Sequence, residues 1–516
     1  MTLAKRMRVG TVAMVATLSL LFAGCSDGGG SDAPKESQGS TSTASQKAQT
    51  LRLYTTIAPS NFTIGNWNGG DATLFLSVYD TLFHREVDGS IAPGIAEKWE
   101  YNEDLTELTM HIRSGLKFTD GEVLDAQAVV DSLNASIAKP GAAAYREEVA
   151  EVKKTDDSTV VIVLKQPTSL LIPYLTGWSG AIGAPDVLTS EASKSEPIGS
   201  GPYIMDLDKT VSGSKYIFTR NPDYYDLESY PYSDLEISVI ADPTAAMNAV
   251  QAGQLDFTTL RSPDLVAQFP ESKFTSGTGK ANSLAALFIV DREGMVVPAL
   301  KEKKVRQAIN MAIDRAAIAT GFGAGSMTPT DQVFSPAIGS AYDPALEDAY
   351  SYDVDKAKAL MAEAGYADGF DVTMPSSVVS TAFEPIITQA LGDIGIKVTW
   401  EAVPFQDLYT KISSLSYGMY FMINGFAGSD AQDTGAVLSG VFNPFGTTTP
   451  ELDTLLKNAN LVEDGSGFGP VNKYLVDEAW FAPILSIASP YVVSNSVTYT
   501  PPVVGSQTVK PWAPAN

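Results

Sequence analysis

The side chains that most often carry out catalysis are scarce in this sequence. Histidine occurs twice, as His84 and His111, and cysteine once, as Cys25. His111 lies on the polar face of an expected strand and His84 follows the apolar stretch TLF, so we expect solvated or capping roles rather than catalysis or metal ligation. The sequence also has neither the CxxC nor the HExxH spacing that zinc requires. We therefore expect no enzyme, no cofactor and no metal site.

One segment invites a phosphate-binding interpretation. The stretch GTGK, residues 277–280, ends like a phosphate loop, but Phe274 stands where the leading glycine should be and Ala281 follows where Ser or Thr is needed. We predict an ordinary turn there. The carboxylate pair 156–157 predicts a solvated loop, since such pairs are common in an acidic chain.

Cys25 ends a segment typical of secretion. Basic residues in the first eight positions precede the uncharged run 9–24, which is a secretory signal pattern. That run is shorter than the ~20 apolar residues that span a bilayer. Small residues directly before Cys25 resemble the bacterial lipobox, where the thiol is acylated and the chain is cut before it, although Phe22 stands where that pattern usually has Leu. The interpretation is a signal peptide over 1–24 and an extracytoplasmic protein anchored through Cys25 to the outer face of the cell membrane.

The next segment and the overall composition describe a tethered globular protein. Residues 25–49 hold the lipidated cysteine and a stretch rich in Gly, Ser and Thr, which predicts a flexible tether. The 516 residues are 44% hydrophobic and 18% charged, as in a folded protein of two or three lobes. A net charge of −25 repels phosphate backbones, so nucleic acid is excluded as a partner.

From Leu51 onward strands alternate with helices. The segment 51–56 alternates apolar and polar residues and predicts a strand, as does 106–113, with Leu108 and Met110 on its apolar face. Asp125 and Asp353 stand where each can cap a following helix. The chain is therefore expected to be α/β throughout.

The stretch from Tyr79 to Val130 is similar to the signature of the peptide- and nickel-binding proteins of ABC importers, known as solute-binding protein family 5. It contains the ordered run of Asp88-Gly89, Trp99, Lys117-Phe118 and Asp120-Gly121. Further blocks agree in order along the chain: PIGSGPY, TRNPDYY, NAVQAGQLDF, KVRQAINMAIDRAAI and YDVDKAKALMAEAGYADGF.

The resemblance implies a type II periplasmic-binding-protein-like fold of the large cluster, with two lobes, a hinge and a subdomain inserted in lobe I. The expected ranges are 50–72, 196–282 and 485–516 for lobe I, 73–195 for the inserted subdomain and 283–484 for lobe II. It also implies a monomer that closes by hinge motion around a peptide or similar small polar organic solute and delivers it to an ABC permease and ATPase. The alternative is a surface lipoprotein with an adhesion, signalling or chaperone role and no transport.

The resemblance further suggests which residues meet the ligand. Peptide binders of this family carry Gly-Trp-x-x-Asp in lobe II, whose aspartate takes the peptide's ammonium; here Gly425 and Phe426 fit the first pair, but the strict spacing puts Ser429 at the carboxylate position and Asp430 one place later. Either a bulge restores Asp430 to that role, or the ligand carries no free amine there and Ser429 offers a hydrogen bond.

The loop after the first strand is expected to line the opposite wall. Its candidate ligand residues are Thr56, Asn61, Trp67 and Asn68, and Tyr420 is a further candidate in lobe II. Trp67 could stack on a ring of the ligand or pack against the hinge.

Overall fold

The computed structural model describes residues 49–66, 72–139, 146, 148–188, 190–323, 325–462, 464–503 and 508–515. Cys25, Trp67 and Asn68 lie outside these residues. Residues 48–516 group into one unit, and we use lobe I, inserted subdomain and lobe II below for the ranges that the sequence predicts.

Lobe I is built around a four-stranded sheet with the order β1-β12-β11-β10. The first strand of the described fold, β1, forms because apolar and polar residues alternate along it. Leu51 and Leu53 point into the lobe I core, while Arg52 and Tyr54 face away from it. The sheet strands are β1 (Thr50–Thr55), β10 (Tyr203–Met205), β11 (Lys215–Arg220) and β12 (Asp234–Val239). The other elements are α5 (Pro243–Gln251), β13 (Phe257–Thr259), β20 (Val497–Tyr499) and β21 (Trp512–Pro514). The helix α1 (Ala72–Val78) packs in the same core, although all but its first residue lie in the range predicted for the inserted subdomain. The strand predicted over 51–56 is confirmed.

The inserted subdomain carries its own sheet, with the order β5-β6-β8-β7, and shares one apolar core with two helices, α2 and α4. The predicted strand over 106–113 is confirmed as β6, with Leu108 and Met110 buried, and Asp125 caps α2 by accepting from the backbone N–H groups of Gln127 and Ala128. Its strands are β2 (Asp80–Thr81), β3 (Phe83–Arg85), β4 (Ile91–Pro93), β5 (Ala96–Tyr101), β6 (Glu107–Ile112), β7 (Val149–Asp156), β8 (Thr159–Leu164) and β9 (Ala181–Ile182). Its helices include α2 (Ala126–Ile137) and α4 (Leu171–Leu175).

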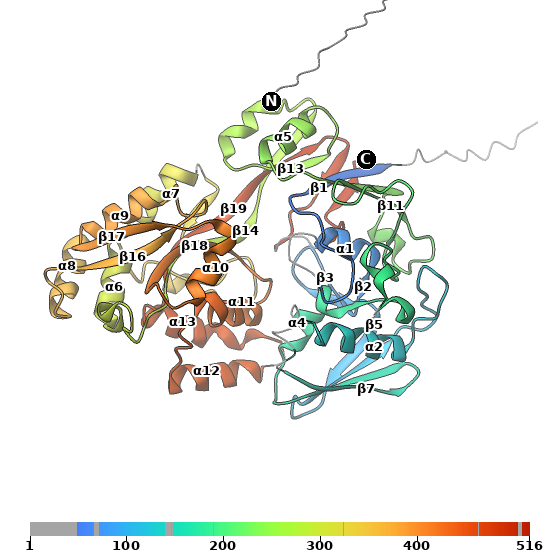
Figure 1. Ribbon diagram of the computed structural model, residues 1–516, viewed down its shortest axis with the longest axis horizontal. Helices are drawn as coiled ribbons and strands as arrows, with labels where there is room; N and C mark the ends of the chain where they lie inside the picture. The colour runs from blue at the N-terminus through green and yellow to red at the C-terminus, as the bar shows by residue number, and fades with distance from the viewer. Residues whose placement is uncertain are drawn as a thin grey trace, which may run out of the picture. The chain divides into compact units, whose positions relative to one another are not determined.

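Lobe II is a layered α/β domain (Figure 1). The strand β14 crosses its centre, and side chains alternate between two cores: Leu287 and Ile289 enter one, and Leu284 and Phe288 enter the other. Both faces are buried because α6 to α9 cover the first core and α10 to α13 the second, as a nearly continuous apolar strand requires.

The predicted cap at Asp353 is confirmed, since its carboxylate accepts from the backbone N–H of Lys356 at the start of α8. The helices of lobe II are α6 (Lys303–Met311), α7 (Arg315–Gly323), α8 (Val354–Glu363), α9 (Glu384–Gly392), α10 (Phe405–Ser413), α11 (Asp430–Val437), α12 (Pro450–Asn460) and α13 (Gly469–Asp477). Its strands are β14 (Phe274–Ile289), β15 (Met327–Pro329), β16 (Phe370–Ser376), β17 (Ile396–Ala402), β18 (Met419–Gly425) and β19 (Ala482–Ser494).

Two long antiparallel strands, β14 and β19, run through both lobes. Toward lobe I, β19 also pairs with β13, and toward lobe II, β14 pairs with β18. The β14–β19 ladder shifts register between Thr278 and Ala281 and again between Ala281 and Ser283. The GTGK stretch lies in this crossing strand, so the turn predicted there is wrong, because pairing with β19 extends the backbone. The boundaries between the lobes remain a prediction. The predicted boundary at 282/283 falls inside β14, and the one at 484/485 falls inside β19.

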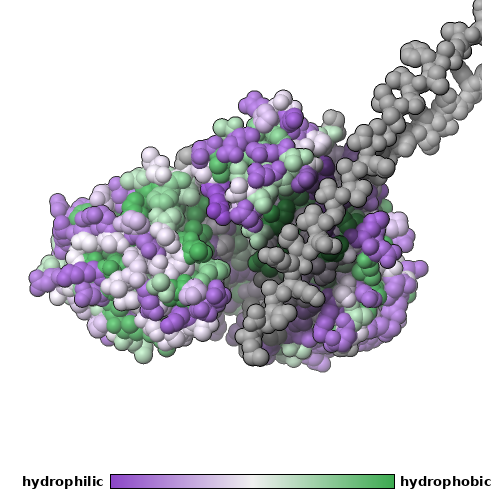
Figure 2. Space-filling model, turned by 45° about the horizontal axis from the view of Figure 1, so that its top comes forward, coloured by the Kyte–Doolittle hydropathy of each residue, from purple (hydrophilic) through white to green (hydrophobic). Residues whose placement is uncertain are grey.

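The face of the molecule in Figure 2 is mixed in character. Hydrophilic residues alternate there with residues of intermediate hydropathy and with apolar patches. Within the described ranges, every helix is too short or too polar to cross a bilayer. The predicted α/β class is confirmed by the strands and helices above.

Candidate ligand-binding cleft

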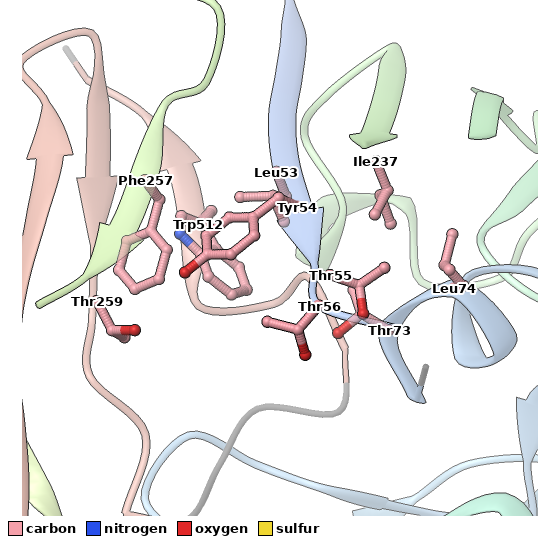
Figure 3. Close-up of a pocket in the computed structure, with 10 residues that line it drawn as sticks. All are labelled: Leu53, Tyr54, Thr55, Thr56, Thr73, Leu74, Ile237, Phe257, Thr259 and Trp512. Carbon is pink, nitrogen blue, oxygen red and sulfur yellow. The ribbon is translucent and has the colours of Figure 1, made fainter. Parts of the chain in front are cut away.

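A cavity of about 260 Å³ opens in lobe I beside the end of β1 (Figure 3). Its walls come from β1, α1, β12, β13 and β21, which are far apart in sequence. The described residues that line it are Leu53, Tyr54, Thr55, Thr56, Thr73, Leu74, Ile237, Phe257, Thr259 and Trp512. Thr56, predicted to face the ligand, is exposed here and lines this cavity.

Polar contacts hold β13 against β1 and so set one side of the cavity. The guanidinium of Arg52 donates to both carboxylate oxygens of Asp256, with 2.8 Å between Nη2 and Oδ1. The hydroxyl groups of Tyr54 and Thr258 lie 3.2 Å apart. These contacts join two strands about 200 positions apart, so the cavity wall depends on tertiary structure.

Aromatic rings pack behind the same wall. The ring centroids of Phe257 and Tyr499 are 4.6 Å apart, and Tyr499 lies 5.1 Å from Trp512. Phe257 and Trp512 meet edge to face at 5.4 Å, an arrangement that adds to the stability from burial. The rings that line the cavity are therefore held in place from behind.

The lobe II segment with the family-like spacing begins where β18 ends. Gly425 is exposed at the end of the strand, and Phe426 is half-buried against the second lobe II core. Ser429 is the N-cap of α11: its hydroxyl accepts from the backbone N–H of Gln432 at 3.2 Å and lies 3.1 Å from Oε1 of the same residue. Ser429 also lines a second hollow, of about 480 Å³.

Asp430 follows directly as the first residue of α11 and is 4% exposed. Its Oδ2 accepts from the backbone N–H groups of Ser340 and Ala341 at 2.7 and 2.9 Å, and the carboxyl lies against Gly339. Burial raises the pKa of Asp430, while the two N–H groups act in the opposite direction. The carboxylate thus holds the neighbouring loop to the helix.

Two charged groups that the sequence analysis missed complete this wall. Arg85, at the end of β3 in the inserted subdomain, donates to the carbonyl of Gly428 and, at 3.3 Å, to Oε1 of Gln432, both in lobe II. Asp433 is 4% exposed, and its Oδ1 accepts from the backbone N–H of Ala427. Burial raises the pKa of Asp433 to about 7, partly offset by Arg85.

Burial likewise lowers the pKa of Arg85 to about 10, and the charge of Asp433 opposes that change.

Asp433 could have been noticed as the residue one helical turn after Asp430, on the same face. Nothing in the sequence around Arg85 signals a contact with a segment more than 340 positions away.

The second hollow is shared between the inserted subdomain and lobe II. Arg85, Ile91 and Trp99 line one side, and Ile338, Ser429 and Asp430 line the other. Its described lining holds both charges and apolar side chains, so it can accept a mixed polar and apolar group.

Other predicted ligand residues take different positions. Tyr420 was expected to meet the ligand, but it is fully buried in the second lobe II core. It stacks on Phe288 and donates its hydroxyl to the carbonyl of Val441 at 2.9 Å. Asn61 is half-buried, and its Oδ1 accepts from the backbone N–H of Thr63 at 2.9 Å, which shapes its own loop.

The solvated or capping role expected for His84 is also wrong. Its side chain is buried, with Nε2 at 2.6 Å from Oδ1 of Asp80 and Lys510 near its other ring nitrogen. His111 is exposed on the polar face of β6, as expected. Across the described residues, no group of three or more His, Cys, Asp or Glu side chains could hold a metal ion.

Comparison with known proteins gives a consistent result. A putative ABC transporter peptide-binding protein of Brucella ovis is 29% identical over 353 residues, which cover 65% of this chain and 64% of that protein. The match thus spans less than two thirds of that relative's length. The heme-binding protein A of Haemophilus influenzae is 27% identical over 462 residues, or 80% of this chain and 81% of that protein.

A solved structure shares the fold. The periplasmic binding protein DppA from Helicobacter pylori, in complex with the peptide STSA, superimposes with a TM-score of 0.75 at 19% identity, covering 91% of this chain and 98% of that one. This confirms the predicted type II periplasmic-binding-protein-like fold. The model of the bacterial extracellular solute-binding proteins, family 5, matches residues 90–445. The chain therefore belongs to that family, as its sequence motifs predict.

Proposed function

We propose that this protein is the extracytoplasmic receptor of an ABC importer, and that it binds a peptide or a similar small polar organic solute between lobe I and lobe II. The observation that carries the proposal is the shared hollow: Arg85 reaches from the inserted subdomain to the carbonyl of Gly428 in lobe II, beside a space of about 480 Å³ lined from both sides. A pocket built from two lobes changes shape when they move, so occupancy can control closure.

The crossing strands support such a motion. The β14–β19 ladder is irregular between Thr278 and Ser283, at the level where the predicted lobes meet. Irregular pairing concentrates bending at a few residues, as a hinge needs. To move the equilibrium from 1:99 to 99:1 in favour of the closed form, the cargo must bind that form better by about 5.5 kcal/mol.

The α11 segment favours a cargo without a free amine at this wall. One oxygen of Asp430, Oδ2, accepts from two backbone N–H groups, and its other oxygen, Oδ1, is buried without a hydrogen-bond partner among the described residues. Asp433 is buried beside Arg85. Within the α11 segment, Ser429 brings an uncharged hydroxyl to the shared hollow, which Ser90 and Ser169 also line. A buried ammonium needs a charged partner, so of the two alternatives from the sequence we prefer the hydrogen bond from Ser429. The relatives differ in cargo, one being named for peptide and another for heme.

A thermal-shift screen tests the receptor function. Dipeptides, oligopeptides, sugars, opines and aromatic acids would each be added to the purified protein, because a ligand at 100 times its Kd adds about 2.7 kcal/mol to stability. Any hit would be followed by small-angle scattering, where we expect the radius of gyration to fall on binding. If no solute raises the melting temperature and scattering shows no closure, the receptor proposal is wrong, and an adhesion, signalling or chaperone role becomes the better hypothesis.

Membrane attachment completes the proposal. The N-terminal pattern ending at Cys25 supports a lipid anchor followed by a flexible tether over residues 25–49. The anchor would keep a monomeric receptor near a permease and ATPase in the membrane. This part of the proposal is independent of the cargo and is tested separately below.

A further inference from the structure

The lobe I cavity has an uncharged lining in the described part of the chain. Its ten described lining residues are four threonines, three aliphatic residues and three aromatic residues (Figure 3). An ionised group of a ligand would lose its water there without gaining an opposite charge from these residues, which is strongly unfavourable. The cavity therefore selects against charged side groups.

The aromatic residues give the cavity a defined apolar wall. Figure 3 shows the rings of Tyr54, Phe257 and Trp512 gathered on one side of the site. Phe257 and Trp512 pack edge to face, and Tyr499 supports both from behind. A ligand ring that enters meets rings already fixed in position, so little order is lost on binding.

The polar groups in the wall are neutral hydrogen-bonding groups. The hydroxyl of Thr56 and that of Thr259 belong to exposed side chains at the mouth. The indole N–H of Trp512 is buried and has no hydrogen-bond partner among the described residues. Because that nitrogen has almost no accessible surface, it is out of reach of a ligand in the cavity, and the threonine hydroxyls at the mouth are the groups that can pair with polar ligand atoms.

The size of the cavity limits what it can hold. At about 260 Å³ it lies below the range of about 300–1,000 Å³ that is common for sites enclosing whole ligands. One side group of a larger cargo fits that volume better than a complete oligopeptide does.

We propose that the lobe I cavity is a specificity pocket for an uncharged aromatic ring of the cargo. The inference rests on the proposed receptor function, and it adds the chemical class that the receptor selects. Thr259 is the residue best placed to test it, because it is exposed at the mouth on β13 and a substitution there disturbs no core packing.

The test uses the full chain and an equimolar tripeptide library with free and acetylated N-termini. Peptides retained by the protein after gel filtration would be identified by mass spectrometry. For the wild type we expect peptides with Phe, Tyr or Trp to be enriched about tenfold over those with Asp, Glu, Lys or Arg, a difference that modest ring contacts can supply. Thr259→Asp should abolish the enrichment, since it puts a carboxylate at the mouth.

Thr399→Asp is the matched control, because Thr399 is an exposed strand threonine in β17 that lines none of the cavities described above. It should retain the wild-type enrichment, and the melting temperatures of both variants without ligand should match the wild type. Peptides retained without aromatic preference, or an unchanged preference in Thr259→Asp, would overturn the specificity pocket while leaving the receptor function intact. Retention of no peptide, together with no melting shift from sugars, opines or aromatic acids, would overturn both.

Discussion

Replacing Asp433 by asparagine should remove a pH dependence from the free energy of unfolding. Burial raises the pKa of this carboxyl from its ordinary value of 3.8 to about 7, so the folded protein binds the proton more tightly than the unfolded chain does. The stability from this group is therefore fully present below about pH 4 and is lost as the pH rises through about 7. Between about pH 6 and about pH 8 the loss is about 1.4 kcal/mol.

The assay compares urea unfolding at those two pH values in the wild type and in Asp433→Asn. Asparagine keeps an oxygen for the backbone N–H of Ala427, so it preserves the packing while removing the proton equilibrium. Asp371→Asn is the control, since Asp371 is an exposed aspartate on β16. We expect the drop in unfolding free energy from about pH 6 to about pH 8 to be smaller by about 1.4 kcal/mol in Asp433→Asn only.

A second measurement observes the proton directly. The amide of Ala427 donates to the Asp433 carboxyl, so its NMR chemical shift should change with pH around a midpoint of about 7. The change should be present in Asp371→Asn and absent in Asp433→Asn. Equal pH dependence of stability in all three proteins, with no inflection at Ala427, would refute the reasoning that burial controls this group.

Three further predictions concern the contacts around the cleft and the anchor. Arg85→Met removes the hydrogen bond to Gly428 and should weaken closure, seen as a smaller fall in the radius of gyration with ligand than in the wild type; an equal fall would argue against this contact. Asp430→Ala leaves the N–H of Ser340 unpaired and should lower the unfolding free energy by about 1–3 kcal/mol. Its affinity for cargo should not change, and a large loss would return the carboxylate to a binding role. Cys25→Ser should move the protein from the detergent phase to the aqueous phase on Triton X-114 partitioning, whereas an unchanged distribution would exclude the lipid anchor.

Local features could be predicted from the sequence because they depend on neighbouring residues. The caps at Asp125 and Asp353 require only a side-chain oxygen and the N–H groups two or three positions later. The strand β6 follows from alternating apolar residues. The family motifs predict the overall fold because they contain, in a fixed order, the turn residues and core residues that the fold requires.

Features that depend on distant segments could not be predicted in this way. From the sequence, Tyr420 looks available to a ligand and His84 looks available to solvent. In the structure, Tyr420 is buried where β18 pairs with β14, and His84 is buried against Asp80. Asp430 looks like a displaced ligand residue, yet its partners are backbone groups of a loop 90 positions earlier. Arg85 has no local signal at all, because its role comes from the approach of the inserted subdomain to lobe II.

The lobe I cavity also has a consequence for synthesis and export. It combines β1, among the first described residues, with Trp512, which follows some 450 positions later. A chain emerging from N- to C-terminus therefore cannot assemble this pocket until residue 512 has left the ribosome or the secretion channel. Lobe II, a continuous stretch, has no such requirement and could fold earlier, so a chain truncated before β21 would present a folded lobe II beside an incomplete binding pocket.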